Sequence, residues 1–350
     1  MRALVLEDKK KLAVKEVEPP VADGKRVIMK VECVGICGSD LHIWEAGERI
    51  GIIMGHEFAG TIVDPGDRKD LRVGDRVTCL STAPCLKCDL CKSGKENLCN
   101  ANSRAPGILS PKNVGAYAEF FSPVQNEYIR KIPDNMSFEE AALNEPALTG
   151  MRAAQVGGVK KGDKVLVAGG GIIGAMTIQW AKTMGADYVA LTEVNQYRLE
   201  KVKSFGYVDE VFDPREPDVS KKMLEKTGAP TIAEGGGFDV FIDCSGNEAA
   251  INFGISLLKK AGTVVFVGIP FKPISFNLFS VVMKQIKAYG LLNYSPASFD
   301  ECLQAIADGR FPVKQYHTAS ATLDEAQKYF ELLENPSNGQ FKVMLYPNKK

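Results

Sequence analysis

Four cysteines lie close together in the first third of the chain, with the spacing C-x2-C-x2-C-x7-C. They are Cys85, Cys88, Cys91 and Cys99. The segment around them is rich in Pro, Lys and Gly and has too few apolar residues to fold around a core of its own. Four thiolates at this spacing are typical of a closed tetrahedral zinc site, whose metal also stabilises the lobe around it. The alternatives are an iron–sulfur cluster, which uses similar spacings, or four unrelated thiols. We interpret the cluster as a structural zinc site, because all four ligand positions are filled by protein.

A glycine-rich turn follows a predicted strand in the middle of the chain. The sequence GGGIIG at residues 169–174 matches G-x-G-x-x-G and leads into an apolar helix. In this context Gly169 permits a tight turn, Gly171 lets the backbone approach a pyrophosphate, and Gly174 lets the helix pack on the strand. The helix N-terminus then faces the phosphates. The motif predicts a dinucleotide site, and the alternative is a glycine-rich turn without function.

An acidic residue, Glu193, ends the next predicted strand, 24 positions after Gly169. A carboxylate there binds a ribose hydroxyl and repels a 2′-phosphate, so we expect NAD to be preferred over NADP. Arg198 follows closely and leaves three possibilities open: it attracts a 2′-phosphate, pairs with Glu193, or stacks on the adenine.

A second set of potential metal ligands precedes the cysteine cluster. Cys37 and His56 are 19 residues apart, and Ser39, Asp40 and His42 follow Cys37 closely. Thiolate and imidazole are frequent zinc ligands. Taken alone, each of these residues also has an ordinary structural interpretation, such as a buried thiol or a surface histidine. The glycines around them predict loops rather than regular structure.

Two kinds of structure are expected to position these residues. The first third predicts short strands at 26–34, 58–63 and 76–79, broken by Gly, Pro and Asp, as in an irregular barrel-like domain. From Gly162 onward, strands alternate with helices, which is typical of a parallel, doubly wound sheet. The predicted strands there are 164–168, 188–192, 239–243 and 263–268, and the predicted helices are 174–184, 196–205 and 248–260. An amphipathic helix at 324–333 and a strand at 342–346 are expected near the end of the chain.

Composition narrows the class of partner. The chain has 350 residues, enough for two domains, and both Lys+Arg and Asp+Glu total 43. Without an excess of positive charge, we expect a small-molecule partner rather than nucleic acid or a membrane surface. The longest apolar stretch, Val165–Met176, is too short to span a bilayer. Nine cysteines without a recognisable signal peptide favour a reducing, cytoplasmic location over a disulfide framework.

Considered together and in order, these motifs resemble the zinc-dependent medium-chain dehydrogenase/reductase superfamily over essentially the full length. The motifs are CGSDLH at 37–42, GHE at 55–57, GDRV at 74–77, the cysteine cluster, AYAEF at 116–120, Glu145-Pro146 and the glycine turn. CGSDLHIW followed by Glu145-Pro146 is similar to the sorbitol, galactitol-phosphate and related polyol branch, with threonine and butanediol dehydrogenases close to it.

The resemblance implies an α/β fold in three segments. A GroES-like, β-rich catalytic domain would occupy residues 1–152 and contain the structural-zinc lobe at 85–99. A Rossmann domain with a doubly wound parallel sheet would follow at 153–292, and residues 293–350 would return to the catalytic domain. A homo-dimer or homo-tetramer is also implied.

The resemblance further implies a second, catalytic zinc, bound by Cys37 and His56. The third protein ligand would be Glu57 or Glu145, and the glutamate that does not bind would orient the others together with Asp40. Hydride would pass between a secondary alcohol, of a polyol, sugar alcohol or sugar derivative, and NAD, while Ser39 and His42 relay the proton. The expected cofactor contacts are Gly169, Gly171, Ile173, Gly174, Glu193, Arg198, Val267, Gly268, Ile269, Leu292 and Asn293.

Two departures from the sorbitol dehydrogenases leave the substrate open. Ile43 stands where those enzymes typically have tyrosine, and Asn293-Tyr294 stands where they have arginine and tyrosine. A modified sugar, an inositol or amino-sugar derivative, a sugar phosphate and a simple diol all remain candidates, as do threonine- and butanediol-type activities. His317 lies either at the site or on the surface. Cys33 and Cys79 match no ligand position and are interpreted as buried strand thiols.

Two rival functions fit these residues less well. A zinc-independent quinone or enoyl reductase of the same superfamily lacks the pair formed by Cys37 and His56. A non-catalytic zinc- and dinucleotide-binding sensor would have no need to retain Ser39 and Glu145 beside that pair.

Overall fold

The computed structural model describes residues 1–82, 84–100, 107, 114–123, 125–229, 235–270, 272–335, 337 and 339–349. Internal contacts divide the chain into two compact units. The first consists of residues 1–145 and 293–350 and the second of residues 146–292; we call them the catalytic unit and the dinucleotide unit after the functions that the resemblance implies. The division falls within helix α4 (Asn144–Gly157), as does the boundary expected at residue 152.

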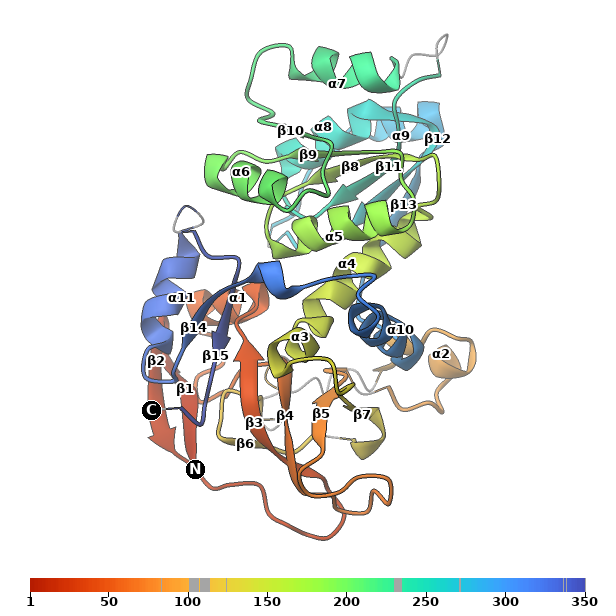
Figure 1. Ribbon diagram of the computed structural model, residues 1–350. Helices are drawn as coiled ribbons and strands as arrows, with labels where there is room; N and C mark the ends of the chain where they lie inside the picture. The colour runs from red at the N-terminus through yellow and green to blue at the C-terminus, as the bar shows by residue number, and fades with distance from the viewer. Residues whose placement is uncertain are drawn as a thin grey trace. The chain divides into compact units, whose positions relative to one another are not determined.

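The catalytic unit is built on a mostly antiparallel sheet (Figure 1). Its strands, in spatial order, are β14 (His317–Ala321), β15 (Lys342–Leu345), β3 (Ile28–Gly35), β4 (Glu57–Asp64), β5 (Arg76–Cys79) and β7 (Ile129–Lys131), with β6 (Phe120–Phe121) paired to β3. A separate hairpin joins β1 (Arg2–Asp8) to β2 (Lys11–Glu16). The C-terminal strand β15 pairs with β3, so the end of the chain completes the sheet that the beginning starts.

Short helices surround this sheet. They are α1 (Gly38–Ala46), α2 (Asp89–Lys92), α3 (Phe138–Ala142), α10 (Pro296–Ala307) and α11 (Ala326–Glu334), with 3-10 turns η1 (Glu96–Leu98), η3 (Asn126–Tyr128) and η4 (Lys314–Tyr316). Among the described residues, none of the helices is long and apolar enough to cross a membrane.

Helix α1 corrects the expectation that Ser39 and His42 lie in a loop. The backbone N–H of Cys37, at the N-cap, donates to Asp40 Oδ2 at 2.9 Å, which satisfies a donor at the start of the helix. The helix buries Trp44 and ends at Gly47, whose φ of 67° lies in the left-handed region that glycine tolerates. Gly38 and Ser39 predict a turn by composition, but the cap starts a helix instead.

The dinucleotide unit contains an all-parallel sheet of six strands. Their spatial order is β10 (Glu210–Phe212), β9 (Tyr188–Thr192), β8 (Lys164–Ala168), β11 (Phe238–Asp243), β12 (Leu258–Phe266) and β13 (Lys287–Gly290). The helices are α5 (Ile172–Thr183), α6 (Gln196–Ser204), α7 (Val219–Thr227), α8 (Glu248–Leu257) and α9 (Leu278–Lys284). Helix α5 covers one face, and α8 and α9 cover the other (Figure 1). The expected doubly wound sheet is confirmed.

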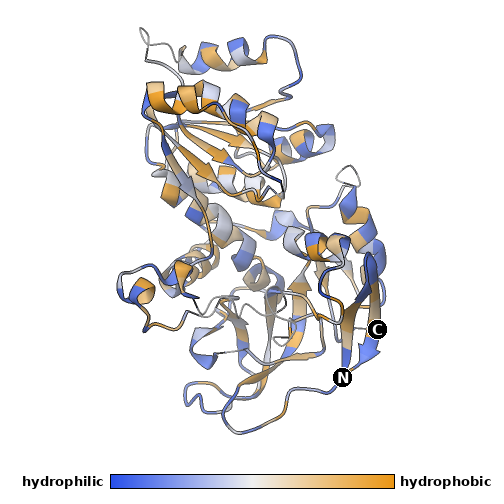
Figure 2. Cartoon of the chain, turned by 180° about the vertical axis from the view of Figure 1, so that it is seen from behind, coloured by the Kyte–Doolittle hydropathy of each residue, from blue (hydrophilic) through white to orange (hydrophobic). Residues whose placement is uncertain are grey.

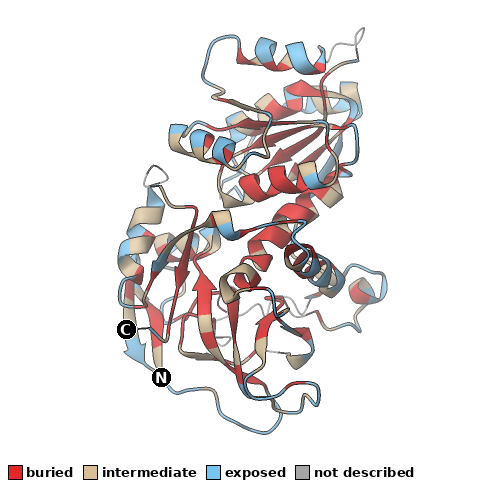
Figure 3. Ribbon diagram, viewed as in Figure 1, coloured by how far each residue is buried: buried red, intermediate tan, exposed pale blue. Residues whose placement is uncertain are grey.

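The strand order also locates a ligand site. Strand β8 is followed along the chain by β9 on one side, whereas β11 lies on its other side. A doubly wound sheet binds ligands at such a reversal, at the carboxyl ends of the strands. The central strands are hydrophobic along their length and almost wholly buried, as Figures 2 and 3 show, because helices cover both faces.

Candidate metal centres and dinucleotide site

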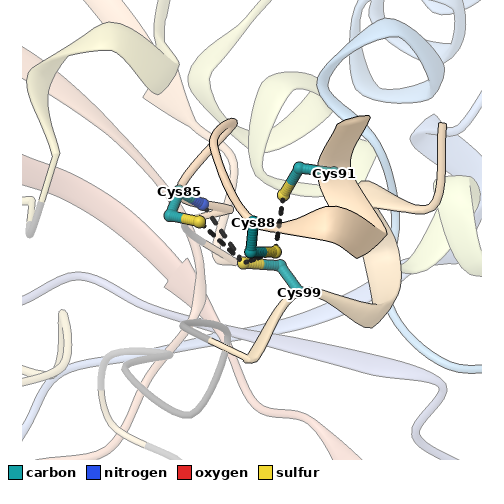
Figure 4. A group of neighbouring side chains, drawn as sticks. All are labelled: Cys85, Cys88, Cys91 and Cys99. Atoms are coloured by element: carbon teal, nitrogen blue, oxygen red, sulfur yellow. Dashed lines mark hydrogen bonds between the residues drawn. The ribbon is translucent and has the colours of Figure 1, made fainter. Parts of the chain in front are cut away.

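The four clustered cysteines converge on one point (Figure 4). The sulfur–sulfur separations are 3.5 Å for Cys85 and Cys99, 3.6 Å for Cys88 and Cys91, and 3.8 Å for Cys88 and Cys99. Sulfurs placed about 2.3 Å from a tetrahedral zinc ion are about 3.8 Å apart. These separations are also far longer than a disulfide bond, and all four residues are free cysteines. The donor set therefore fits a zinc ion.

Backbone N–H groups favour the thiolate form within this cluster. Hydrogen bonds from the backbone N–H groups of Lys87 and Cys88 lower the pKa of the Cys85 thiol to about 6. The backbone of Cys91 likewise lowers the pKa of Cys88. Burial and the neighbouring thiols raise the pKa of Cys91 to about 12. Because zinc binds thiolates, the lobe is partly prepared for the ion before it arrives.

A second group of ligand atoms lies in the catalytic unit. Cys37, His56 and Glu57 each offer one atom, and these three atoms lie within 4.8 Å of one another. Cys37 directly precedes α1. His56 directly precedes β4, and Glu57 is the first residue of β4, which is paired with β3. His56 and Glu57 are buried, and Cys37 is partly exposed.

Asp40 contacts two of these residues, and Tyr117 in turn contacts Asp40. Asp40 is fully buried, and its Oδ2 accepts hydrogen bonds from Tyr117 Oη at 2.6 Å and from Cys37 N at 2.9 Å. Its Oδ1 lies 3.6 Å from His56 Nδ1. Burial raises the pKa of Asp40, but His56 and these hydrogen bonds lower it by more. The pKa of Asp40 is therefore below its usual value. Burial lowers the pKa of His56, yet Asp40 and Cys37 raise it well above its usual value.

Among the described residues, the buried Ser39 Oγ has no hydrogen-bond partner, and neither do Asp40 Oδ1 and His56 Nδ1, which face each other at 3.6 Å, beyond hydrogen-bond distance. Buried polar atoms without partners are rare in folded proteins and call for an explanation. Together with a thiolate, an imidazole and a carboxylate, they indicate a site that a metal and a ligand complete. These donors suit zinc, which accepts sulfur, nitrogen and oxygen ligands and keeps an open position in catalytic sites.

Glu57 is held by a residue that sequence reasoning missed. Lys342, at the start of β15, donates to both carboxylate oxygens of Glu57, with Nζ 2.7 Å from Oε1. Both side chains are 1% exposed. Burial lowers the pKa of Lys342, but Glu57 and Cys37 raise it more, so the amine stays charged. A lysine at the head of the apolar sequence KVML was the available signal, since a cation rarely begins a fully buried strand without a partner.

Glu145, the other candidate carboxylate, lies in the first turn of α4. Tyr294 Oη donates to Glu145 Oε1 at 2.8 Å. Burial raises the pKa of Glu145, and Glu57 adds to this effect, while His56 and the Tyr294 hydrogen bond oppose it. Glu145 is not among the three residues whose ligand atoms converge within 4.8 Å.

Ser39 and His42 lie one turn apart on α1, three residues along the same helical face. The Ser39 hydroxyl oxygen is buried, whereas His42 is exposed. Helix α1 thus holds a buried hydroxyl and an exposed imidazole one turn apart.

The glycine turn has the geometry that the motif predicts. Gly169 has a φ of 95°. A Cβ at Gly174 would lie 1.8 Å from Gly169 O, so helix α5 can approach the turn only because Gly174 lacks a side chain. A Cβ at Gly171 would meet no atom of the described residues within 4 Å, which leaves open space beside the start of the helix. Ile173 follows in the first turn of α5, where free backbone N–H groups favour an anion.

Glu193 lies directly against this turn. Its Oε2 accepts from Gly170 N at 2.7 Å, and its Oε1 accepts from Val194 N at 2.7 Å and Asn195 N at 2.8 Å. Arg198 Nη1 is 3.9 Å from Glu193 Oε2, which agrees with the pairing alternative. The three N–H groups fix a negative charge at the end of β9.

The loops after β11 and β12 form the next part of the same sheet edge. Asp243, fully buried, accepts from Ser245 N, Ser245 Oγ and Gly246 N, and its carbonyl accepts from the N–H groups of Val267 and Gly268. Asp243 therefore joins two loops beside the glycine turn, a role that sequence reasoning missed because every contact but one is to the backbone.

The remaining predicted residues differ in their exposure and contacts. Ile269 and Leu292 are exposed, at 74% and 55%. Asn293 belongs to the catalytic unit, where its Nδ2 donates to Asn97 O at 3.3 Å. His317 Nε2 contacts Ala319 O and Ser320 Oγ of its own strand and is not in the converging group. Cys33 and Cys79 are buried in strands β3 and β5.

Comparison with known proteins agrees with this geometry. The alcohol dehydrogenase GroES-like domain family matches residues 23–134, and the zinc-binding dehydrogenase family matches residues 173–308. Sorbitol dehydrogenase of Bacillus subtilis is 31% identical, over 100% of this chain and 98% of its own. A probable D-xylulose reductase A of Aspergillus terreus is 31% identical over 89% of each chain. The crystal structure of 2R,3R-butanediol dehydrogenase from Bacillus subtilis superposes with a TM-score of 0.86 at 27% identity, covering 99% of both chains.

The chain therefore belongs to the zinc-binding medium-chain dehydrogenases. It is an oxidoreductase that uses zinc and a nicotinamide dinucleotide to act on a small-molecule alcohol.

Proposed function

We propose that this protein oxidises a secondary alcohol of a polyol or sugar derivative with NAD, at a zinc ion held by Cys37, His56 and a glutamate. The observation that carries the proposal is the convergence of Cys37, His56 and Glu57 within 4.8 Å, beside the unpartnered hydroxyl of Ser39. A zinc ion bound there supplies Lewis-acid chemistry, which lowers the pKa of an alcohol oxygen.

The protein's own residues prepare the ligands and move the proton. Asp40 and Tyr117 fix His56 and the backbone of Cys37, in the manner of the outer partners that orient metal-ligating side chains. Ser39 accepts the hydroxyl proton of the substrate and passes it outward to the exposed His42 on the same face of α1. Glu57 and Glu145 supply the third ligand between them, with Glu57 closer to Cys37 and His56.

The preference for NAD over NADP rests on Glu193. Its carboxylate is fixed by three backbone N–H groups beside Gly170, where a 2′-phosphate would meet it. Val267, Gly268, Ile269, Leu292 and Asn293 are proposed to contact the rest of the cofactor.

The polyol class rests on the relatives, named as sorbitol dehydrogenases and xylulose reductases. Tyr294, whose hydroxyl donates to Glu145, is proposed to bind a substrate hydroxyl. Ile43 offers no hydrogen bond where a tyrosine would, so fewer hydroxyls are recognised. The B. subtilis butanediol dehydrogenase has a similar structure, so a diol is the second candidate.

A substrate panel tests the proposal. Purified protein is assayed for NAD and NADP reduction with sugar alcohols, inositols, amino-sugar derivatives, sugar phosphates, threonine and 2,3-butanediol. Activity on a polyol that is lost in Cys37→Ser and kept in Cys79→Ser, a matched change of a buried thiol outside the site, supports the proposal. A panel without dehydrogenation by zinc-loaded protein would favour the non-catalytic sensor.

A second, structural zinc is proposed on the four cysteines, giving two zinc ions per chain. Because this ion needs four reduced thiols, a reducing compartment such as the cytoplasm is proposed as the location. Zinc content that falls by one equivalent in Cys85→Ser/Cys88→Ser protein is the expected result.

A homo-oligomer is proposed on the surface of the dinucleotide unit. Helix α9 exposes Leu278, Phe279, Val282 and Met283 by between 49% and 72%, and the adjacent edge strand β13 is exposed throughout. Exposed apolar patches and open strand edges are usually covered, and two copies related by a two-fold axis can cover both edges at once. Light scattering should show Phe279→Glu to be smaller than the wild type, and Val73→Glu, a 69% exposed valine in the catalytic unit, to be unchanged.

A further inference from the structure

Lys342 is buried in the catalytic unit as a charged group with every N–H donor satisfied. Its ammonium donates to both oxygens of Glu57 and to Ile36 O at 2.8 Å. The amine stands on β15, at the far end of the chain from β4, which carries Glu57. The return of the C-terminal segment therefore delivers one positive charge to the metal-ligand group.

The backbone around the pair is shaped to accommodate it. Gly35 of β3 lies opposite Glu57 in the sheet register and is also paired with Met344 of β15. A Cβ at Gly35 would lie 2.3 Å from Glu57 Oε2 and 3.2 Å from Lys342 Cδ. Gly35 has no positive φ to explain it, so the requirement for glycine here comes from the space that the ion pair fills.

Stability alone does not account for the pair. Replacing a buried ion pair by apolar side chains of similar volume is often neutral or stabilising, because the charges lose their hydration. A buried pair beside metal ligands therefore points to a role in the charge of the site.

The number of charges shows what that role is. Cys37, Asp40, Glu57 and Glu145 bring four negative charges when ionised, against the two positive charges of a zinc ion. Lys342 donates to both carboxylate oxygens of Glu57 and so offsets one of these charges. Without its ammonium the site carries one more net negative charge.

We propose that Lys342 is a positioning residue of the catalytic zinc site: it fixes Glu57 and cancels its charge, so that the metal stays electron-poor enough to acidify an alcohol. The inference rests on the proposed catalytic zinc. Lys342 weakens zinc binding and increases the ability of the metal to acidify an alcohol. Its removal should therefore tighten zinc binding while slowing turnover.

Two variants test this opposite response. Zinc affinity is measured by competition with a chelator in Lys342→Met, and the Cys37→Ser protein reports the lobe zinc alone. Removing a unit charge a few ångströms from a divalent ion should tighten zinc binding at least about tenfold, and the rise of kcat with pH should move to higher pH. Zinc affinity at or below the wild-type value would overturn the proposal, because a purely structural lysine would weaken the site when removed.

The second variant guards against misfolding. Lys342→Met leaves a buried carboxylate unpaired, so the same substitution is also made in Glu57→Gln protein, where no charge is left alone. Lys342→Met should again tighten zinc binding in that background, now relative to Glu57→Gln, and a weaker or unchanged affinity would count against the proposal. If Cys37→Ser keeps two zinc equivalents, the proposed site itself is wrong, which is a different failure from a site that binds zinc but ignores Lys342.

Discussion

Two glycines of one turn should fail for different reasons when each becomes alanine. At Gly174 the new Cβ would lie 1.8 Å from Gly169 O, well inside the 3.4 Å of ordinary contact, so α5 or the turn must move by more than an ångström. Overpacking of this kind costs about 1–3 kcal/mol, and more where backbone rather than a side chain is in the way. At Gly171 the new Cβ meets no atom within 4 Å in the part of the chain that the structure describes, and the φ of −70° suits alanine, so stability should change by less than about 1 kcal/mol.

The same two variants should also separate folding from binding. The methyl group of Gly171→Ala enters the open space where the pyrophosphate is expected, so NADH affinity should fall about tenfold or more, although the fold is intact. Thermal unfolding gives stability, and Trp180 on α5 is a fluorescence reporter inside the same unit. Wild-type stability in Gly174→Ala, or equal destabilisation of both variants, would refute this interpretation of the turn.

Three further predictions concern the site residues. Ser39→Ala should lower kcat by about 10²–10⁴-fold, because only the proton path is cut, while NADH affinity by fluorescence stays the same; a rate near the wild type would remove Ser39 from the relay. Glu193→Gln, which keeps the size and removes the charge, should narrow the ratio of kcat/KM for NAD over NADP, and an unchanged ratio would mean that another residue discriminates. In zinc-depleted protein Cys85 should be alkylated fastest: its lowered pKa makes it a thiolate above about pH 6, and its reactivity should fall as the pH drops through that value. A midpoint near the usual 8.5 of a free thiol, read by mass spectrometry, would show that the lobe loses its backbone hydrogen bonds without zinc.

Local patterns predicted much of the fold. Strands 76–79, 164–168 and 188–192 have the bounds that the sequence predicted, because each is a run of strand-forming residues that directly follows an aspartate. The four cysteines and the glycine turn were found because their chemistry depends on spacing within one segment. Features of this kind can be predicted because they depend only on residues within one short segment.

Predicted helix and strand boundaries were wrong where a competing local signal was stronger. Strand β12 begins at Leu258, whereas a helix was expected as far as residue 260. Lys259 and Lys260 suit the last turn of a helix, but Lys259 instead forms an ion pair with Asp239 of the neighbouring strand β11. Helix α1 was missed because Gly38 and Ser39 suggest a turn, while the cap that starts the helix is a hydrogen bond from Cys37 to Asp40.

The outer residues of the metal site could not be predicted, because they come from distant segments. Lys342 is 285 positions from Glu57, and Tyr117 is 77 positions from Asp40. A strand at 342–346 was expected, and β15 is present there. The strand with which it pairs was not predicted, and that pairing makes Lys342 part of the site. Which distant strands meet is a property of the sheet rather than of any local pattern.

The most direct test of the central claim is the zinc content and turnover of Cys37→Ser protein. Zinc analysis of the wild type and the variant is combined with dehydrogenation of the best substrate and with NADH binding followed by fluorescence. The structure predicts two zinc equivalents in the wild type, one in Cys37→Ser, loss of turnover, and unchanged NADH affinity, because the nucleotide rests on the glycine turn of the other unit. Full turnover in Cys37→Ser, or two zinc equivalents retained, would contradict a catalytic zinc at Cys37 and His56.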